Sequence, residues 1–213
     1  MNITDFSTSI LFAVAILAGP ACGEVAIVDG DTFDLNGVRI RLNGIDAPEY
    51  GQTCGSWKCG ADALEALNTL VNSGPVTCQK MGDDGYGRII ARCSVQGRDI
   101  GATMVSEGMA YAFVKYSADY VAEEKQAQSM KTGLWRGDFQ KPWEYRAEKW
   151  EVAEQEAPDG CPIKGNISEN GRIYHAPWSP WYKKTKIDEA KEERWFCSEA
   201  EAVSAGWRAP KWR

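Results

Sequence analysis

The chain has 213 residues, 44% of them hydrophobic, and a formal net charge of −6. This composition is typical of a globular protein with one medium domain and a smaller one, and it excludes a disordered chain. An acidic balance is unexpected for a protein that binds the phosphates of nucleic acid, so any groove of that kind must be locally basic.

The first 23 residues are interpreted as a secretory signal peptide. Residues 10–21 form an apolar run that is short for a membrane span, and small residues follow at 19–23. The chain is therefore expected to be secreted or periplasmic, with no stable membrane association after cleavage. An uncleaved anchor stays open, because Asp5 and no Lys or Arg precede the apolar run. The residues before Cys22 match a lipidation site poorly.

Residues 25–49, VAIVDGDTFDLNGVRIRLNGIDAPE, predict three short strands. The first two, at 25–28 and 32–35, flank an Asp-Gly-Asp turn, and residues 38–42 alternate apolar and cationic side chains. Asn36-Gly37 favours a tight hairpin, because both residues tolerate a positive φ.

Asp31, Arg41, Asp46 and Glu49 all lie at the ends of these strands, where the mouth of a barrel would bring them together. Close carboxylates repel unless a hard cation or protons compensate them, and an arginine suits a phosphate. A further glutamate that is not a ligand can activate water. These groups favour phosphodiester hydrolysis; the alternative is a hairpin with a solvated acidic rim.

The pattern continues with short helices and strands. Arg88 begins a predicted strand after a glycine-rich loop, so its side chain can reach the same mouth as Arg41. The predicted helices cover 58–72, 98–107 and the segment from Ser117 to Gly133, and the predicted strands or extended segments cover 76–80, 88–95 and 111–116.

Without Cys22 the chain holds six cysteines, an even number that favours disulfides in an exported protein. Cys78 and Cys93 lie symmetrically about the turn near Gly85, so they can face each other across a hairpin. A zinc site is the disfavoured alternative, because paired C-x-x-C spacings are lacking and His175 is the only histidine. The expected pairs are Cys54–Cys59, Cys78–Cys93 and Cys161–Cys197.

The last part of the chain differs in character, because most of the nine tryptophans lie beyond residue 140. A polar helix is predicted from Pro142 to about Gln155, followed by a linker signal at 157–160. The small module at 161–213 needs a staple, which Cys161–Cys197 would supply. The expected divisions are therefore a signal at 1–23, a first domain at 24–146, a helical linker at 147–160 and this module.

Three lysines of the module lie beside aromatic residues that can stack on bases. Lysines and stacking aromatic residues together suggest binding of single-stranded nucleic acid. The favoured interpretation is a small aromatic core with a solvated lysine rim. His175 is interpreted as a structural hydrogen-bonding residue. The lysines are Lys183, Lys184 and Lys186, and the aromatic residues are Trp181 and Tyr182.

Residues 24–146 resemble the thermonuclease (micrococcal-nuclease-like) family. The resemblance is carried by VDGDT at 28–32, RLNGIDAPE at 41–49, DGYGR at 84–88 and EGMAYAFVKYS at 107–117. It implies a mixed fold, mainly β with α, in which a five-stranded OB-type barrel carries three helices. It also implies cleavage of DNA and RNA with calcium.

The resemblance assigns a role to each matching residue. Asp31 and Asp46 match the calcium carboxylates, and Ala47, which replaces the usual threonine, would still offer its backbone carbonyl. Asp29 matches an acid behind these ligands, and Glu49 matches the residue that activates water. Arg41 and Arg88 match the pair that neutralises the phosphate. Tyr86 and Tyr116 match tyrosines of the nucleotide pocket, a third falls near Phe113 or Val114, and the lysine of the usual D-K-Y-G-R run is Gly85 here.

The C-terminal module resembles small modules attached to some exported members of this family. CPIKGNIS at 161–168, RIYH at 172–175 and RWFCSEAEAVSAGWR at 194–208 carry that resemblance, which implies no activity. The chain as a whole is expected to be an exported, calcium-dependent endonuclease acting on DNA or RNA. The alternative is an inactive OB-fold module that binds single-stranded nucleic acid or a protein partner in the cell envelope.

Overall fold

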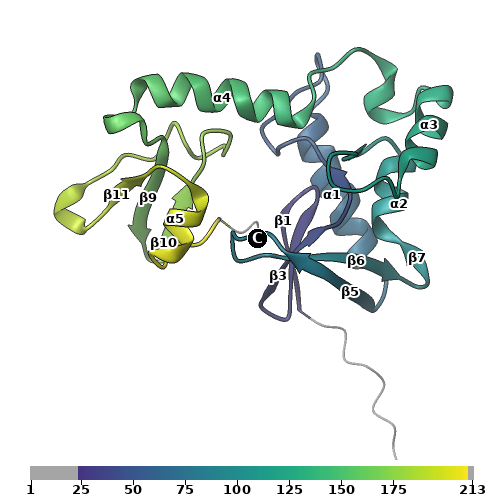
Figure 1. Cartoon of the computed structure of the whole chain (residues 1–213), viewed down its shortest axis with the longest axis horizontal. Helices are drawn as coiled ribbons and strands as arrows, with labels where there is room; N and C mark the ends of the chain where they lie inside the picture. Colours follow the sequence, from purple (N-terminus) through teal and green to yellow (C-terminus); the bar gives the residue numbers. More distant parts are fainter. Residues whose placement is uncertain (1–23, 211–213) are drawn as a thin grey trace, which may run out of the picture.

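The computed structural model describes residues 24–210. Figure 1 shows two folded parts, a larger one formed by the elements before α4 and a smaller one formed by the elements after it. Helix α4 (Pro142–Glu156) runs along one side and connects them. The predicted signal segment, 1–23, lies outside the described residues.

A sheet forms the centre of the larger part. All its neighbouring strands are antiparallel except β3 and β6, which are parallel. The mixed class and the OB-type fold expected from the sequence are confirmed. The strands are β1 (Val25–Asp29), β2 (Thr32–Leu35), β3 (Val38–Leu42), β5 (Val76–Asp83) and β6 (Ile89–Val95), in the order β1-β2-β3-β6-β5, with β7 (Arg98–Asp99) added to β6.

The first hairpin forms as its sequence predicts. Asn36 and Gly37 adopt φ values of 53° and 80°, which is the left-handed pair that a tight turn between β2 and β3 needs. Strand β5 is longer than predicted, because the register shifts between Lys80 and Gly82 and pairing with β6 then continues to Asp83. The glycine-rich loop is correspondingly shorter.

Three helices cover the sheet, and their apolar faces form one core with it. Phe33, Leu67, Ile100 and Met104 are all fully buried in this core. The helices are α1 (Cys59–Val71), α2 (Ile100–Ser106) and α3 (Val121–Met130), followed by the 3₁₀ turn η1 (Gly133–Arg136); the short strands β4 (Ile45–Asp46) and β8 (Tyr111–Ala112) pair beside them.

The segment before α3 corrects two predictions. The extended segment stops at Ala112, because the amides of Tyr116 and Ser117 donate to the Phe113 carbonyl and close a turn. The helix begins at Val121 rather than at Ser117. The Ser117 hydroxyl accepts from the amide of Asp119, which favours a turn over a helix at this point.

The smaller part is a three-stranded antiparallel sheet with one helix packed on it. Its core is aromatic, with Tyr174, Phe196 and Trp207 buried around Ile163. Lys183, Lys184 and Lys186 are exposed, as the favoured interpretation of a solvated rim requires. The elements are η2 (Pro158–Gly160), β9 (Ile163–Ser168), β10 (Gly171–His175), η3 (Glu189–Lys191), β11 (Arg194–Phe196) and α5 (Glu199–Ser204), with the strand order β10-β9-β11.

All six cysteines beyond the signal segment form disulfides, in the predicted pairs Cys54–Cys59, Cys78–Cys93 and Cys161–Cys197. Pairing leaves none of them as a thiolate ligand, so the zinc alternative was wrong. Across residues 24–210, no helix has the length and apolar content that crossing a bilayer requires.

Candidate active site

Three carboxylates that are distant in the sequence converge at the end of the sheet. Asp31 lies in the turn between β1 and β2, Asp46 ends β4, and Glu49 follows Pro48. All three are buried, and Asp46 is completely inaccessible. The turn is fixed to its neighbour because the amide of Ala47 donates to Asp31 Oδ2 at 3.2 Å. Gly30 permits this approach, since a Cβ there would lie 2.8 Å from the Ala47 side chain.

Arg41 bridges two of these carboxylates from β3. Its Nη1 atom donates to Asp31 Oδ1 at 2.7 Å and its Nη2 atom donates to Asp46 Oδ1 at 3.1 Å. The alternation of β3 places Arg41 on the face opposite the buried Ile40 and Leu42. The structure thus brings together Asp31, Arg41 and Asp46 as one hydrogen-bonded group.

A second arginine, Arg146, enters the same group from α4 and was not identified from the sequence. Its guanidinium donates to Asp46 Oδ2 at 2.7 Å, to Asp46 Oδ1 at 3.0 Å and to Glu49 Oε1 at 2.8 Å. The available signal was spacing: Trp143, Arg146 and Trp150 lie three and four positions apart, which places them on one face of the helix.

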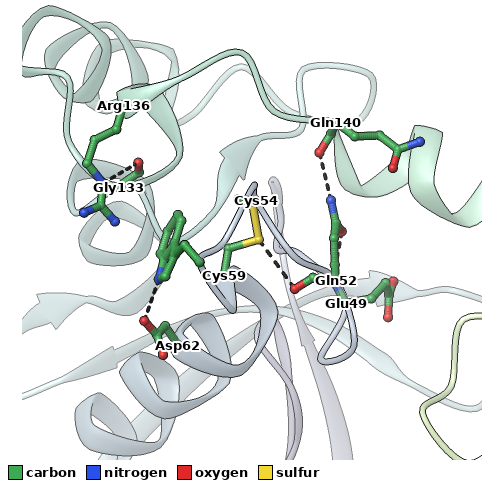
Figure 2. Close-up of a disulfide and its surroundings, with 9 residues drawn as sticks. Glu49, Gln52, Cys54, Cys59, Asp62, Gly133, Arg136 and Gln140 are labelled. Carbon is green, nitrogen blue, oxygen red and sulfur yellow. Dashed lines mark hydrogen bonds between the residues drawn. A yellow bond between two sulfur atoms is a disulfide. The ribbon is translucent and has the colours of Figure 1, made fainter.

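The loop after Glu49 is held by backbone contacts and by a disulfide (Figure 2). The Gln52 amide donates to the Glu49 carbonyl at 2.7 Å, and Gln52 Nε2 donates to the Gln140 carbonyl at 2.8 Å. Cys54–Cys59 then ties the loop to the start of α1. Glu49 is therefore positioned by a short, covalently closed segment.

The carboxylates have different protonation preferences. Burial and the nearby charge of Glu49 raise the pKa of Asp29 well above its ordinary value. Burial also raises the pKa of Glu49, although Arg146 opposes this. Burial acts in the same direction on Asp31, but Arg41 and the Thr32 hydroxyl outweigh it and lower the pKa of Asp31.

The other predicted site residues line a cleft above this group rather than joining it. Arg88 pairs with Asp84 at the start of β6, and its charge also lowers the pKa of Asp31. Tyr86 and Tyr116 are largely exposed, with relative accessibilities of 41% and 69%. Phe113 also lines the cleft and stacks on Trp143 with ring centroids 5.6 Å apart.

Both folded parts contribute walls to this cleft, which has a volume of about 850 Å³. The larger part supplies Asp31, Arg41, Glu49 and Arg88. The smaller part supplies Tyr174, Trp178, Trp181, Trp207 and Arg208. Lys183, Lys184 and Lys186 do not line the cleft; His175 is buried nearby between Asn166 and Ser179, in the structural role expected for it.

The carboxylate oxygens define the groups that could hold a metal. Within residues 24–210 no three His, Cys, Asp or Glu side chains are arranged as a metal cluster. Asp31 and Asp46 nevertheless converge, because one guanidinium bridges them. Calcium accepts carboxylate, carbonyl and water oxygens in flexible geometry, so this pair with the Ala47 carbonyl would suit it if the arginines released the carboxylate oxygens.

Comparison with known proteins identifies the class of this fold. Residues 39–137 match the family model described as staphylococcal nuclease homologue, a range that contains Arg41, Asp46, Glu49 and Arg88. Residues 145–209 match a second model, described as ArfC, and Arg146 lies within that range.

Curated relatives agree with the first match. An uncharacterized endonuclease of Escherichia coli is 32% identical over 148 residues, which cover 65% of this chain and 94% of the relative. Micrococcal nuclease of Shigella flexneri is 34% identical over 156 residues, which cover 62% and 87%. The succinoglycan biosynthesis protein ExoI of Rhizobium meliloti is 32% identical over 130 residues, which cover 56% and 66%.

These matches and the buried carboxylate–arginine group define a phosphodiester hydrolase. The chain belongs to the staphylococcal nuclease homologue family, with an ArfC-like module at its C-terminus.

Proposed function

We propose that this protein is an exported, calcium-dependent nuclease that cleaves DNA or RNA endonucleolytically. The observation that supports this most directly is the convergence of Asp31, Asp46 and Glu49 with Arg41 at the floor of a cleft. Arg88 on the wall of that cleft supplies a further cation facing it.

The chemistry follows from the positions of these groups. A bound calcium ion would polarise a phosphoryl oxygen and lower the pKa of water. Glu49 accepts a proton from the water that attacks phosphorus, and the P–O bond to the leaving oxygen breaks as the new bond forms. The leaving oxygen keeps the electron pair of that bond and takes up a proton from solvent. Arg41 and Arg88 each have guanidinium N–H groups beyond those used in their ion pairs, and these stabilise the charge that develops on the phosphoryl oxygens.

Two features bear on location and substrate. Three disulfides favour an oxidising compartment, in agreement with export through the apolar segment at 10–21. A cleft of about 850 Å³ is of the size that encloses a small ligand. It is therefore large enough to admit a nucleotide.

The decisive experiment is a cleavage assay on supercoiled plasmid, single-stranded DNA and RNA. Cleavage is expected with calcium and is expected to stop in a calcium chelator. Glu49→Gln should lower turnover by about 10²- to 10⁴-fold, because Gln cannot accept the proton. Glu65→Gln, on the exposed face of α1, is the matched control and should cleave normally.

Two results would contradict the proposal: near-normal turnover by Glu49→Gln, or activity that survives the chelator. A wild-type protein that binds single strands but never nicks plasmid would instead support the alternative, an inactive binding module. One observation supports this alternative: Arg41 and Arg146 donate hydrogen bonds to both carboxylate oxygens of Asp46.

A further inference from the structure

Arg146 reaches the active site from outside the nuclease fold. It lies on α4, and 100 residues of sequence separate it from Asp46. It falls beyond the nuclease match, which ends at residue 137, and within the ArfC-like match, which begins at residue 145. This arginine therefore lies in the range that the ArfC model matches, on the helix that connects the two folded parts.

Its guanidinium occupies the oxygen atoms that a cation would need. Asp46 Oδ2 accepts from Arg146 at 2.7 Å, while Asp46 Oδ1 accepts from Arg146 at 3.0 Å and from Arg41 at 3.1 Å. Arg146 also donates a hydrogen bond to Glu49 Oε1 at 2.8 Å. Asp46 Oδ1 thereby uses both of its lone pairs, and a divalent cation at Oδ2 would lie against a positive guanidinium. The cation and the bidentate guanidinium therefore compete for this carboxylate.

Contacts at both ends of α4 hold the helix in place. Trp143 near its start stacks on Phe113 with ring centroids 5.6 Å apart. Trp150, one turn beyond Arg146, packs against the core of the module. The ring centroids of Trp150 and Trp178 are 6.3 Å apart. The helix therefore presents Arg146 at a defined position. The arginine side chain keeps 21% of its surface accessible, so solvent reaches it at this position.

We propose that Arg146 competes with the catalytic cation for Asp46 and thereby sets the cation affinity of the enzyme; this inference rests on the proposed calcium-dependent function. In the cation-free protein its charge relieves the repulsion among Asp31, Asp46 and Glu49. Cation binding through these oxygens displaces it, so the apparent affinity equals the intrinsic affinity multiplied by the fraction of molecules in which Arg146 has left Asp46. Arg146 is a positioning residue, because it acts on the ligands and not on the substrate.

The test measures calcium binding directly, by isothermal titration calorimetry of the purified chain without nucleic acid. Arg146→Gln is expected to bind calcium about ten-fold more tightly or better, because the bidentate competitor is gone. Arg146→Lys, which keeps the charge but loses the fork of donors, should fall between this variant and the wild type.

Arg39→Gln controls for charge. It removes a cation from the same cleft, but Arg39 pairs with Asp34 and not with the site carboxylates. Its calcium affinity should change much less than that of Arg146→Gln. Far-ultraviolet circular dichroism checks that each variant is folded. If Arg146→Gln does not fold, the calcium affinity of Arg146→Lys is compared with that of the wild type instead.

The outcomes separate this inference from the proposed function. Equal or weaker calcium binding by the Arg146 variants, beside measurable binding by the wild type, overturns the competition and leaves the proposed function intact; a merely structural ion pair predicts that result, with a lower melting temperature. An equal gain in Arg39→Gln also overturns it, since general charge repulsion would then suffice. No calcium binding by any variant contradicts both proposals.

Discussion

At the scale of single residues, the sequence identified the acids of this site but not all of their partners. Asp31, Asp46 and Glu49 follow strand ends, and alternation along β3 placed Arg41 near them. These positions depend on local conformation, which short patterns encode well. The position of Arg146 depends on where a distant helix packs. Its spacing from Trp143 and Trp150 indicates a shared helix face but not which surface that face meets.

His175 gives a prediction about pH at this scale. Burial and the nearby Lys164 lower the pKa of His175 to about 4, from an ordinary value of 6.5. Between these values the unfolded state binds the proton and the folded state does not, so stability is complete above pH 6.5 and falls as the pH falls toward 4. The loss should reach about 3 kcal/mol.

Urea titrations at pH 7 and pH 4.5, followed by tryptophan fluorescence, measure this loss. Other carboxylates titrate in the same range, so the informative quantity is the difference between the wild type and His175→Gln. The variant should show a shallower decline toward acid pH. A parallel decline in both proteins would rule out His175 as its source.

At the scale of elements, α1 packs directly on the loop that carries Glu49. Gly60 lies in the first turn of this helix, and a Cβ there would lie only 1.7 Å from the Glu49 carbonyl oxygen and 3.0 Å from the Tyr50 carbonyl carbon. Backbone atoms cannot rotate away as the end of a side chain can. The helix and the catalytic loop must therefore separate if any side chain is added at Gly60.

Gly60→Ala should accordingly affect both stability and activity. Overpacking is expected to cost about 1–3 kcal/mol, and a displacement of Glu49 by about 1 Å can lower turnover by about 10²-fold. Thermal melting and plasmid cleavage provide the two measurements. Gly82→Ala is the control, since nothing lies within 4 Å of its Cβ position; full activity in Gly60→Ala would show that the loop adapts.

At the scale of the whole molecule, the module is part of the active-site cleft and not an appendage beside it. Figure 1 shows α4 running from the larger part to the smaller one, and Trp178, Trp207 and Arg208 line the same cleft as Arg88. A Cβ on Gly87 would also touch the Val203 side chain at 3.4 Å, so the two parts are in contact there. Folding of the module thus determines the shape of the site.

The Cys161–Cys197 disulfide should dominate the stability of that module. Its half-cystines are 36 residues apart in the sequence, for which the chain-entropy model gives about 4 kcal/mol. The double variant Cys161→Ser with Cys197→Ser is expected to unfold its module at much lower urea than the wild type. Unfolding followed by hydrogen exchange should show the module's amides losing protection before those of β1–β6; unchanged protection of the module would contradict this prediction.

The sequence by itself determined the features that depend on neighbouring residues. It placed β2, β3 and the Asn36-Gly37 turn, because side-chain alternation and a tolerance of positive φ act within a few residues. It also indicated the cysteine pairs, because spacing and a shared hairpin limit which thiols can meet. Where a local hydrogen bond to a side chain competed with the helix, as at Ser117, the predicted helix start was wrong.

Only the tertiary structure decided what completes the site. Arg146 meets Asp46 across 100 residues and Glu49 across 97, through a helix anchored on both folded parts. The aromatic wall of the cleft likewise arises because the smaller part packs beside the larger one. The sequence pattern of each part describes only the contacts within that part. Such contacts depend on the shapes of two complete surfaces, and the periodicity of a short sequence segment does not predict how two surfaces pack.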